Sequence, residues 1–345
     1  MGRVRESVTM RDVAALASVS VKTVSNVING YRYLRPDTKA RVEAAIRTLG
    51  YRVNVTARNL RQGRTGLIKL VIPELRIPYF AELADSVVRE AAERELTVLV
   101  EQHQYQRDLE LRVLRGEGGQ QVDGVLFSPV YVGQDDVDLF DVGFPMVILG
   151  ESVFDAPCDH VSMRNVEAAT AQVEHLAALG RTRIGVIGVN EMPILSSSVL
   201  RFRGVKLGLE LAGLSLDPGL VAGPGPWVRP TGARLMGELL DRGHRLDAVV
   251  CFNDTLALGA LHELIRRGIR VPDDVAVIGF DNVEETQFSQ PTLSTIDPGR
   301  DRIAAESVRM LCERVGLVDD FDPATSPREL LVDYQVVPRQ STLGL

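Results

Sequence analysis

The chain has 345 residues, of which 45% are hydrophobic, and this length and composition fit two or three compact units with substantial cores. No apolar run approaches the ~20 residues of a membrane span, and the N-terminus lacks the apolar core of a secretion signal, so we expect a cytoplasmic protein that does not enter a membrane. Three cysteines, odd in number and widely spaced, predict buried free thiols rather than a disulfide framework or a metal site: Cys158, Cys251 and Cys312.

The charge of the chain is divided unevenly. Residues 1–66 hold 13 Lys and Arg against 4 Asp and Glu, a balance of +9, whereas the whole chain carries −7 and residues 67–345 therefore carry −16. A basic head binds the DNA backbone through release of condensed counterions, and an acidic body discourages indiscriminate binding. A basic head that lies on an anionic membrane is the alternative, but the second predicted helix, over residues 21–29, has too few large apolar residues for it.

Residues 8–30, VTMRDVAALASVSVKTVSNVING, predict two short helices separated by a brief break. Thr9 and Asp12 have the spacing of a capping box at the start of the first helix. Ser20 is a good N-cap for the second helix, which buries Val24, Val27 and Ile28. Its other face carries side chains that suit base edges and phosphates in a major groove: Val21, Lys22, Thr23, Ser25, Asn26 and Asn29. An ordinary helical hairpin with a solvated polar face remains the alternative.

A third helix is predicted to begin at Pro36 and to end at Gly50, with an apolar stripe at Val42, Ala45, Ile46 and Leu49. We therefore expect a helix-turn-helix DNA-binding domain over 1–52.

Residues 53–66 link this head to the rest of the chain. Asn54 can cap a short helix that includes Ala57 and Leu60, and so short a helix needs a partner helix or DNA to persist. Leu60 has two readings: an apolar wedge in an opened minor groove, or a side chain packed on the body.

Residues 67–345 alternate strand-like and helix-like segments, which predicts parallel sheets with helices on both faces. The strands are expected at 67–72, 96–100, 124–127, 146–149, 184–187, 248–252 and 275–279, and the helices at 80–92, 166–179, 201–212 and 255–267. The pattern restarts after Asp159. We therefore expect two similar lobes with a ligand between them at the carboxyl ends of the strands.

Polar and aromatic side chains gather after the predicted strands: 78–80, 196–198, Arg201, Trp227, Asn253-Asp254 and Asp281-Asn282. Carboxylates and amides exchange hydrogen bonds with hydroxyls, Arg offers a fixed fork of donors, and a ring packs on apolar C–H faces, so the set suits a sugar-like polyol. Each residue also has an ordinary reading. Asp254 and Asn282 can cap helices, Arg201 can form a local ion pair, and Trp227 can belong to the core.

These stretches also carry a family resemblance: VTMRDVAALASVSVKTVSNVING, RVEAAIRTLGY, ARNLRQGRTGLIKLVIP, YFAELADSVVREAAER, VDGVLFSP, HLAALGRTRIGVIG, FNDTLALGALHELIRRGIRVPDDVAVIGFDN and PTLSTID. Over almost its whole length the chain resembles the lactose-repressor/galactose-repressor (LacI/GalR) family of bacterial transcription regulators. The resemblance implies an all-α helix-turn-helix head and an α/β body of two doubly wound, periplasmic-binding-protein-like lobes. It further implies a homodimer on double-stranded operator DNA, a hinge helix formed on DNA, and a small-molecule effector between the lobes.

The resemblance also assigns roles by position. Val21, Lys22 and Asn26 resemble base-reading residues. Positions that contact the phosphate backbone in the family are Thr9, Ser20, Thr23, Ser25, Asn29 and Tyr51. The hinge residues are Asn54, Ala57 and Leu60, with Leu60 as the minor-groove wedge. The effector-pocket positions are Tyr79, Phe80, Arg201, Trp227, Asn253 and Asp281.

The chain departs from the family pattern at several positions. Asn26 stands where many members have Arg, which implies a different half-site, and Val53 replaces a common Pro. Gly150 stands where sugar-binding members often place Asp, with Glu151 beside it as a substitute, and Arg164 stands where Asp is common. The tail lacks a leucine heptad, which favours a dimer over a tetramer.

Two other classes of protein are alternatives. A sugar-binding protein for transport or sensing would share the body but would need a secretion signal and no basic head. A hydrolase or dehydrogenase could use Asp254 and Asp281, but the sequence shows no Ser–His–Asp order, metal cluster or phosphate loop. We therefore expect a repressor, not an enzyme, that needs no cofactor. A sugar or sugar derivative would change its operator affinity by linkage.

Overall fold

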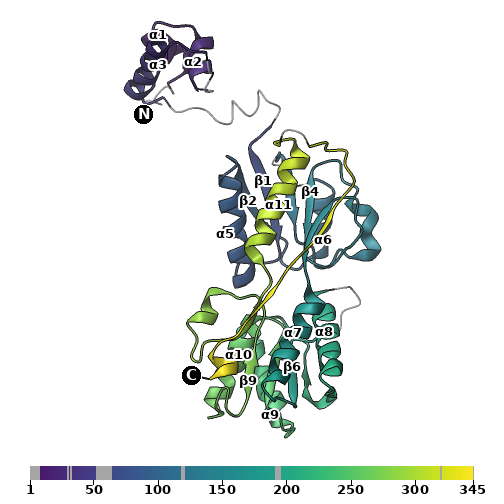
Figure 1. Cartoon of the computed structure of the whole chain (residues 1–345). Helices are drawn as coiled ribbons and strands as arrows, with labels where there is room; N and C mark the ends of the chain where they lie inside the picture. Colours follow the sequence, from purple (N-terminus) through teal and green to yellow (C-terminus); the bar gives the residue numbers. More distant parts are fainter. Residues whose placement is uncertain are drawn as a thin grey trace, which may run out of the picture. The chain divides into compact units, whose positions relative to one another are not determined.

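The computed structural model describes residues 8–28, 31, 33–51, 64–117, 121–190, 196–318 and 321–344. The chain forms two compact units that divide between Thr65 and Gly66. The first is a head of three helices and the second is an α/β body of two lobes (Figure 1). The predicted fold class is confirmed, whereas most of the linker predicted at 53–66 lies outside the described residues.

The head contains α1 (Met10–Leu16), α2 (Val21–Ile28) and α3 (Pro36–Leu49), where apolar spacing predicted them. The predicted capping box is present: the Thr9 N–H donates to Asp12 Oδ2 at 2.8 Å, and the Asp12 N–H donates to Thr9 Oγ1 at 3.4 Å. The Thr23 N–H donates to Ser20 Oγ at 3.1 Å at the start of α2. Gly50 ends α3 in the left-handed conformation, with φ of 63°. The small core of the head includes Val13, Val24 and Val42.

The first lobe is built on a parallel sheet with the strand order β11-β5-β4-β3-β1-β2. Its strands are β1 (Leu67–Ile72), β2 (Thr97–Gln102), β3 (Gly124–Phe127), β4 (Met146–Leu149), β5 (Asp159–Met163) and β11 (Glu329–Val332). Because alternate side chains of a strand point to opposite faces, each face has its own cover. Leu126 and Val147 pack with α5 (Pro78–Ala92) and α11 (Arg300–Val315). Phe127 and Ile148 pack with α6 (Arg107–Leu114) and the 3-10 helix Gln134–Phe140.

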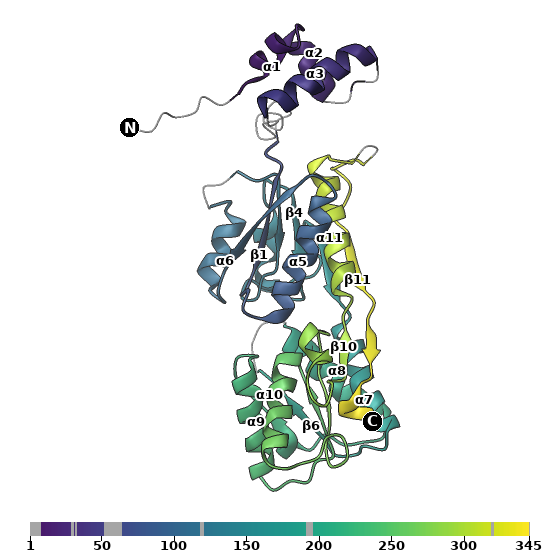
Figure 2. The same cartoon turned by 90° about the vertical axis from the view of Figure 1, so that its left-hand side faces the viewer.

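The second lobe has a parallel sheet in the order β7-β6-β8-β9, formed by β6 (Ile184–Ile187), β7 (Val221–Ala222), β8 (Ala248–Cys251) and β9 (Ala276–Ile278). Helices α7 (Asn165–Ala178) and α8 (Ser197–Leu211) lie on one side, and α9 (Arg229–Asp241) and α10 (Asp254–Arg266) lie on the other (Figure 2). The helices of each pair approach closely at glycines. A Cβ at Gly204 would lie 2.2 Å from the carbonyl oxygen of Val166, and one at Gly259 would lie 2.1 Å from that of Arg229.

Within the described residues the chain passes between the lobes at three places: from β5 to α7, from β10 (Thr295–Asp297) to α11, and from β11 to β12 (Gln335–Val337). β10 and β12 pair antiparallel. The remaining elements are the 3-10 helices Pro218–Leu220 and Glu284–Gln287 and the short α12 (Gln340–Leu343).

The predicted restart of the pattern after Asp159 is found at α7 and β6, but the first lobe is not finished at that point. β5 begins at Asp159 and still belongs to the first sheet, and α11 and β11 later return to that lobe. β11 pairs with β5, which places Glu329 opposite His160. The two strands are far apart in the sequence, so a reading of local pattern could not anticipate their pairing.

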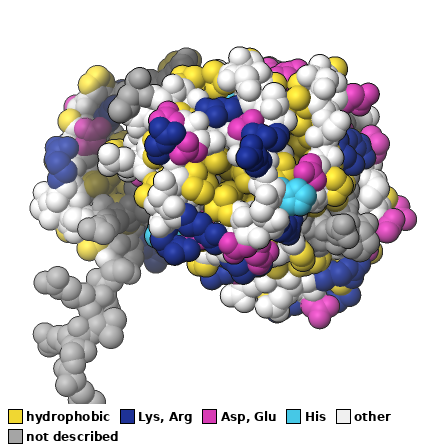
Figure 3. All heavy atoms as spheres, turned by 90° about the horizontal axis from the view of Figure 1, so that it is seen from below, with side chains coloured by type: hydrophobic (Ala, Val, Ile, Leu, Met, Phe, Trp, Pro, Cys, Tyr) yellow, Lys and Arg dark blue, Asp and Glu magenta, His cyan; other side chains and the backbone are white. Residues whose placement is uncertain are grey.

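Charges of both signs mix on the surface of the second lobe. Figure 3, a view from the end where this lobe lies, shows Lys and Arg side chains interspersed with Asp and Glu side chains. Arg267 pairs with Asp241 and Arg270 with Asp274, each at 2.5 Å. Such a surface differs from the basic balance of the head.

Two further predictions concern apolar segments and thiols. None of the described helices is long and apolar enough to cross a membrane. Cys251 and Cys312 are buried free thiols, as predicted, whereas Cys158 is a half-buried one.

Candidate functional site

The first candidate site is the outer face of α2 in the head. Val24 and Val27 are held in the core, so the helix turns its opposite side outward. That side carries the predicted recognition residues, of which Val21 and Lys22 are exposed and the others half-buried: Thr23, Ser25 and Asn26. Thr9 and Ser20, expected at the phosphate backbone, are exposed at the starts of α1 and α2.

Tyr51 lies differently from the other predicted backbone contacts. It is 9% exposed and packs in the head core, so burial leaves only a small part of it for a phosphate. Sequence reasoning missed Tyr31 and Tyr33, two exposed rings that meet edge to face after α2 with centroids 5.8 Å apart. The remaining predicted DNA contacts lie outside the described residues: Asn29, Asn54, Ala57 and Leu60.

The described part of the head carries several exposed cations. The described basic side chains of residues 8–51 are all exposed: Arg11, Lys22, Arg35, Lys39, Arg41 and Arg47. Among the acids, Asp12 is held in the cap of α1 and Glu43 lies 3.9 Å from Lys39. The head therefore keeps the cationic surface that phosphate binding requires.

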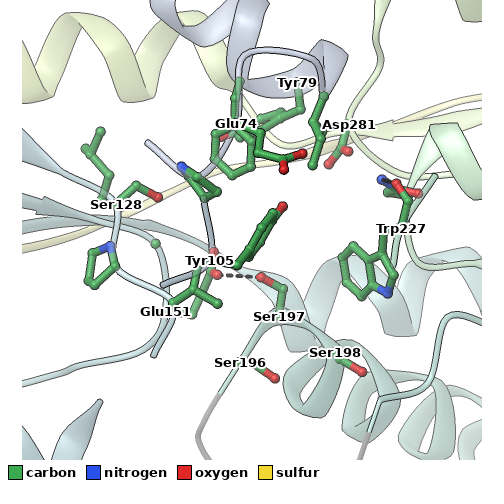
Figure 4. A pocket seen from close by; sticks show the side chains of 18 of the residues that line it. Glu74, Tyr79, Tyr105, Ser128, Glu151, Ser196, Ser197, Ser198, Trp227 and Asp281 are labelled. Atoms are coloured by element: carbon green, nitrogen blue, oxygen red, sulfur yellow. Dashed lines mark hydrogen bonds between the residues drawn. The ribbon is translucent and has the colours of Figure 1, made fainter. Parts of the chain in front are cut away.

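The second candidate site is a cavity of about 610 Å³ between the two lobes of the body. The structure places all six predicted effector-pocket residues on its lining: Tyr79, Phe80, Arg201, Trp227, Asn253 and Asp281. Each lies at or beyond the carboxyl end of a strand, the edge at which parallel sheets usually bind ligands. Figure 4 shows Tyr79, Trp227 and Asp281 around the space.

Arg201 of α8 is the most heavily bonded residue of this wall. It is 3% exposed, its Nε donates to Asn165 Oδ1 at 2.7 Å, and its Nη1 donates to the Phe252 carbonyl oxygen. Nη1 also lies 3.7 Å from Asp281 Oδ1, and the guanidinium lies 3.5 Å from the centre of the Phe280 ring. Burial lowers the pKa of Arg201, and the charge of Asp281 opposes that effect. The ion-pair reading of Arg201 therefore holds, with a partner inside the cavity.

Asp281 sits in an unusual backbone conformation at the end of β9. Its φ is 115°, in the region that favours glycine, and Asn282 follows with φ of 50°. Burial raises the pKa of Asp281 to about 7, although Arg201 and Arg300 stabilise its charged form. The carboxyl group is therefore poised between its two protonation states near neutral pH.

The suggestion that Asp254 and Asn282 cap helices is wrong. The cap of α10 is Asn253, whose Oδ1 accepts from the Leu256 N–H at 2.8 Å. Asp254 instead accepts from Thr295 Oγ1 at 2.6 Å and from the Val283 N–H at 3.0 Å, and burial raises its pKa well above the usual value. Asn282 Nδ2 donates to Asp297 Oδ2 at 3.0 Å, so both side chains fasten the loop that carries Asp281.

Trp227 is half-buried and lies between the core of the second lobe and the cavity. Its indole Nε1 donates to the Gly188 carbonyl oxygen at 3.0 Å, and its ring meets Phe252 edge to face at 6.0 Å. It packs partly against the core of the second lobe and also lines the cavity. On the first lobe, the Tyr79 ring packs edge to face on Phe80 at 5.3 Å, and burial raises the pKa of Tyr79.

A buried carboxylate anchors the loop that forms another part of the lining. Glu110 of α6 accepts from the N–H groups of Val130 and Tyr131, each at 2.9 Å, and from that of Val132 at 2.7 Å. These bonds satisfy both oxygens of a fully buried side chain and fix the loop in place.

Two lining residues were missed or only partly foreseen. Tyr105 lies beyond the carboxyl end of β2 and extends into the space, as Figure 4 shows. Gln104 and Tyr105 both have positive φ, 52° and 55°, a strain found at ligand sites. Glu151, considered only as a substitute for an Asp, accepts from Ser197 Oγ at 2.7 Å across the cavity. The strand-end rule that selected Tyr79 would also have selected Tyr105.

No cluster of His, Cys, Asp or Glu that could hold a metal ion occurs among the described residues. The cavity instead offers hydroxyl, amide, carboxylate and aromatic groups. Such groups bind small organic molecules.

Comparisons with known proteins give the class of this chain. "Bacterial regulatory proteins, lacI family" matches residues 9–54, and "Periplasmic binding protein-like domain" matches residues 173–342. The HTH-type transcriptional repressor CytR of Escherichia coli K12 is 32% identical over 98% of this chain and 97% of that protein. The HTH-type transcriptional repressor PurR of Haemophilus influenzae is 30% identical over 90% of this chain and 92% of that protein. Among solved structures, a complex of the transcriptional regulator CelR with cellobiose has 29% identity and a TM-score of 0.71, covering 97% of this chain and 99% of that one.

The helix-turn-helix head and the two-lobed body are those of DNA-binding transcription regulators. The chain belongs to the LacI family of bacterial regulatory proteins. Both of these curated relatives, CytR and PurR, are named as transcriptional repressors.

Proposed function

We propose that this chain is a sequence-specific transcriptional repressor whose affinity for operator DNA is set by a small molecule bound between the lobes. Residues 1–52 would form the DNA-binding head, 53–66 the hinge, and 67–345 the effector-binding and dimerisation domain. The main support for the proposal is that six effector-pocket positions, from both lobes, line one cavity of about 610 Å³.

The DNA-binding part rests on the exposed face of α2. Lys22 stands exposed in its first turn, and further exposed cations of the head supply contacts to phosphates. We propose that a homodimer sets two such faces on the half-sites of a near-palindromic operator, because a twofold protein matches a twofold site.

The effector is proposed to be a sugar or sugar derivative. Trp227 and Tyr105 offer rings to apolar C–H faces, and Asn253 and Ser197 offer groups that exchange hydrogen bonds with hydroxyls. The similarity to CelR, a regulator seen bound to cellobiose, supports this choice.

Coupling between the two sites needs no chemical step. A ligand that contacts both lobes stabilises the lobe arrangement that fits it, and the operator favours one arrangement as well. Each partner then changes the affinity of the other by the same factor.

The test uses the purified full chain and DNA fragments from the neighbourhood of its own gene. We expect a gel shift at low ionic strength that a sugar found by thermal-shift screening strengthens or weakens. Absence of binding to every fragment would contradict the proposal. Sugar binding without DNA binding would favour a sugar-binding protein for transport or sensing.

Lys22→Ala should change base preference at one or two half-site positions in a randomised-site selection, because an exposed donor at the start of α2 reads base edges. Lys39→Ala, an exposed lysine of α3 paired with Glu43, is the matched control and should leave the preference unchanged. If Lys22→Ala selects the wild-type sequence, Lys22 does not read bases.

A further inference from the structure

The carboxylate of Glu151 differs from the other acids of the cavity. Glu151 follows β4 and Gly150 in the first lobe, and it is only 7% exposed. Its Oε2 accepts from Ser197 Oγ at 2.7 Å, and Ser197 is the first residue of α8 in the second lobe. One acid group therefore joins the two lobes across the cavity, as the dashed line in Figure 4 shows.

The second oxygen of this carboxylate is unsatisfied. Glu151 Oε1 is buried and has no hydrogen-bond partner among the described residues. Glu110, by comparison, fills its oxygens with three backbone N–H groups. A buried carboxylate oxygen without a partner is costly, and at the lining of a cavity it marks a place for a donor supplied from outside.

The cations of the lining are already engaged. Arg201 donates to Asn165 and Phe252, lies beside Asp281, and stacks on the Phe280 ring. Arg76 pairs with Glu74 at 2.5 Å, and its side chain is largely exposed. An anionic ligand would therefore be buried near Glu151 and Asp281 without a free counter-charge, which is strongly unfavourable.

We propose that Glu151 selects the ligand of this cavity. The ligand donates a hydroxyl or ammonium hydrogen bond to Glu151 Oε1 and carries no net negative charge, so phosphorylated and carboxylated compounds are excluded. The bond from Ser197 to the same carboxylate ties ligand recognition to the approach of the two lobes. This inference rests on the proposed role of the cavity as an effector site.

The experiment uses the full chain and matched sets of probes: glucose, glucosamine, glucose 6-phosphate and glucuronate; cellobiose and cellobionate; adenosine and adenosine monophosphate. Calorimetry and thermal shift give the Kd of each. We expect binding only from uncharged or amino-bearing members. Glu151→Gln should weaken the best of them by about tenfold to a hundredfold, because the amide has a single acceptor oxygen, and when Ser197 Oγ donates to it the amide nitrogen faces the ligand.

Glu93→Gln is the control, since Glu93 is exposed, has the same charge, and lies off the lining of the cavity. Thermal unfolding without ligand separates binding from folding, because loss of an unsatisfied buried charge should not lower the Tm of Glu151→Gln. Any one of three results would overturn the inference. The first is an anionic probe that binds more tightly than its uncharged parent. The second is an equal effect of the two substitutions on Kd. The third is a complete lack of binding by uncharged and amino-bearing probes.

DNA binding by the wild-type chain is measured separately. A chain that shifts operator DNA but prefers an anionic probe contradicts the inference about Glu151 alone. A chain that binds uncharged probes but no DNA contradicts the proposed function alone.

Discussion

The two walls of the cavity are built in opposite ways. On the second lobe, Arg201 and Asn253 are hydrogen-bonded to neighbouring protein groups, and Asp281 lies 3.7 Å from Arg201 Nη1, so contacts within the protein already hold this wall in place. On the first lobe, Tyr105 extends into the space and Glu151 keeps an unsatisfied oxygen. The difference implies that the second lobe supplies a rigid platform and that the first lobe supplies groups whose bonds a ligand completes.

The largest expected effect comes from removing the Arg201 side chain from the second-lobe wall of the cavity. Arg201→Ala should lower the free energy of unfolding of the body by about 3 kcal/mol, because it removes a buried charge and leaves its partners unpaired. It should also abolish the response of DNA binding to the effector. Denaturant unfolding and anisotropy titrations measure the two effects.

Arg203→Ala in the same helix is the control for that substitution, since Arg203 is exposed and should change stability by less than about 0.5 kcal/mol. A stable Arg201→Ala protein with an intact effector response would show that the platform is misplaced.

A second substitution tests the first-lobe wall of the cavity. Tyr105→Ala should weaken ligand binding by about tenfold, because stacking on an aromatic ring is lost, yet change unfolding by less than about 1 kcal/mol. Tyr105 is 36% exposed and already held at positive φ, so it contributes little to the core. Calorimetry and thermal unfolding would report the two quantities. A large loss of stability with unchanged ligand affinity would show that Tyr105 supports the fold of the first lobe and does not bind the ligand.

The last expected effect is a dependence of stability on pH. Burial raises the pKa of Asp281 from its ordinary value of 3.8 to about 7, so the folded chain binds a proton more tightly than the unfolded chain. Protonated Asp281 therefore stabilises the folded chain at low pH, and this contribution to the free energy of unfolding is lost as pH rises from about 4 to about 7. Arg201 and Arg300 reduce the effect, and Glu151 and Glu82 increase it.

Asp281→Asn removes this titration. Relative to wild type, the variant should be more stable at pH 8 than at pH 4.5, by about 1 to 4 kcal/mol over that interval. Denaturant midpoints at the two pH values supply the difference. A difference of the opposite sign would mean that Asp281 is stabilised as a carboxylate in the folded chain.

Local patterns were enough for the elements that depend on neighbours in the sequence. Thr9 and Asp12 predicted a cap that the structure contains, and the strands at the centre of both sheets were found from their continuous apolar runs. The six effector-pocket positions reached one cavity because parallel strands end at a common edge.

The features that sequence reasoning missed depend on distant contacts. α6, α9 and α11 were not predicted, and β11 belongs to the first sheet only because it pairs with β5. Asp254 looked like a cap, but its bonds go to Thr295 and Val283, which a local pattern does not place nearby. The unsatisfied oxygen of Glu151 also cannot be recognised from the sequence, because it depends on how α8 lies relative to Glu151 in the folded chain.

The chain crosses between the two lobes at three places, and this arrangement has a consequence for protein engineering. Neither lobe is formed by one continuous segment of the chain. Helix α11 and strand β11 return to complete the first lobe, and β12 then pairs with β10 beside the second lobe. A chimera that exchanges one lobe for that of a relative therefore needs three junctions, at the passages after β5, β10 and β11. A single-junction graft, or a truncation before residue 329, would strip the outer strand from the first sheet and unpair β10 at once.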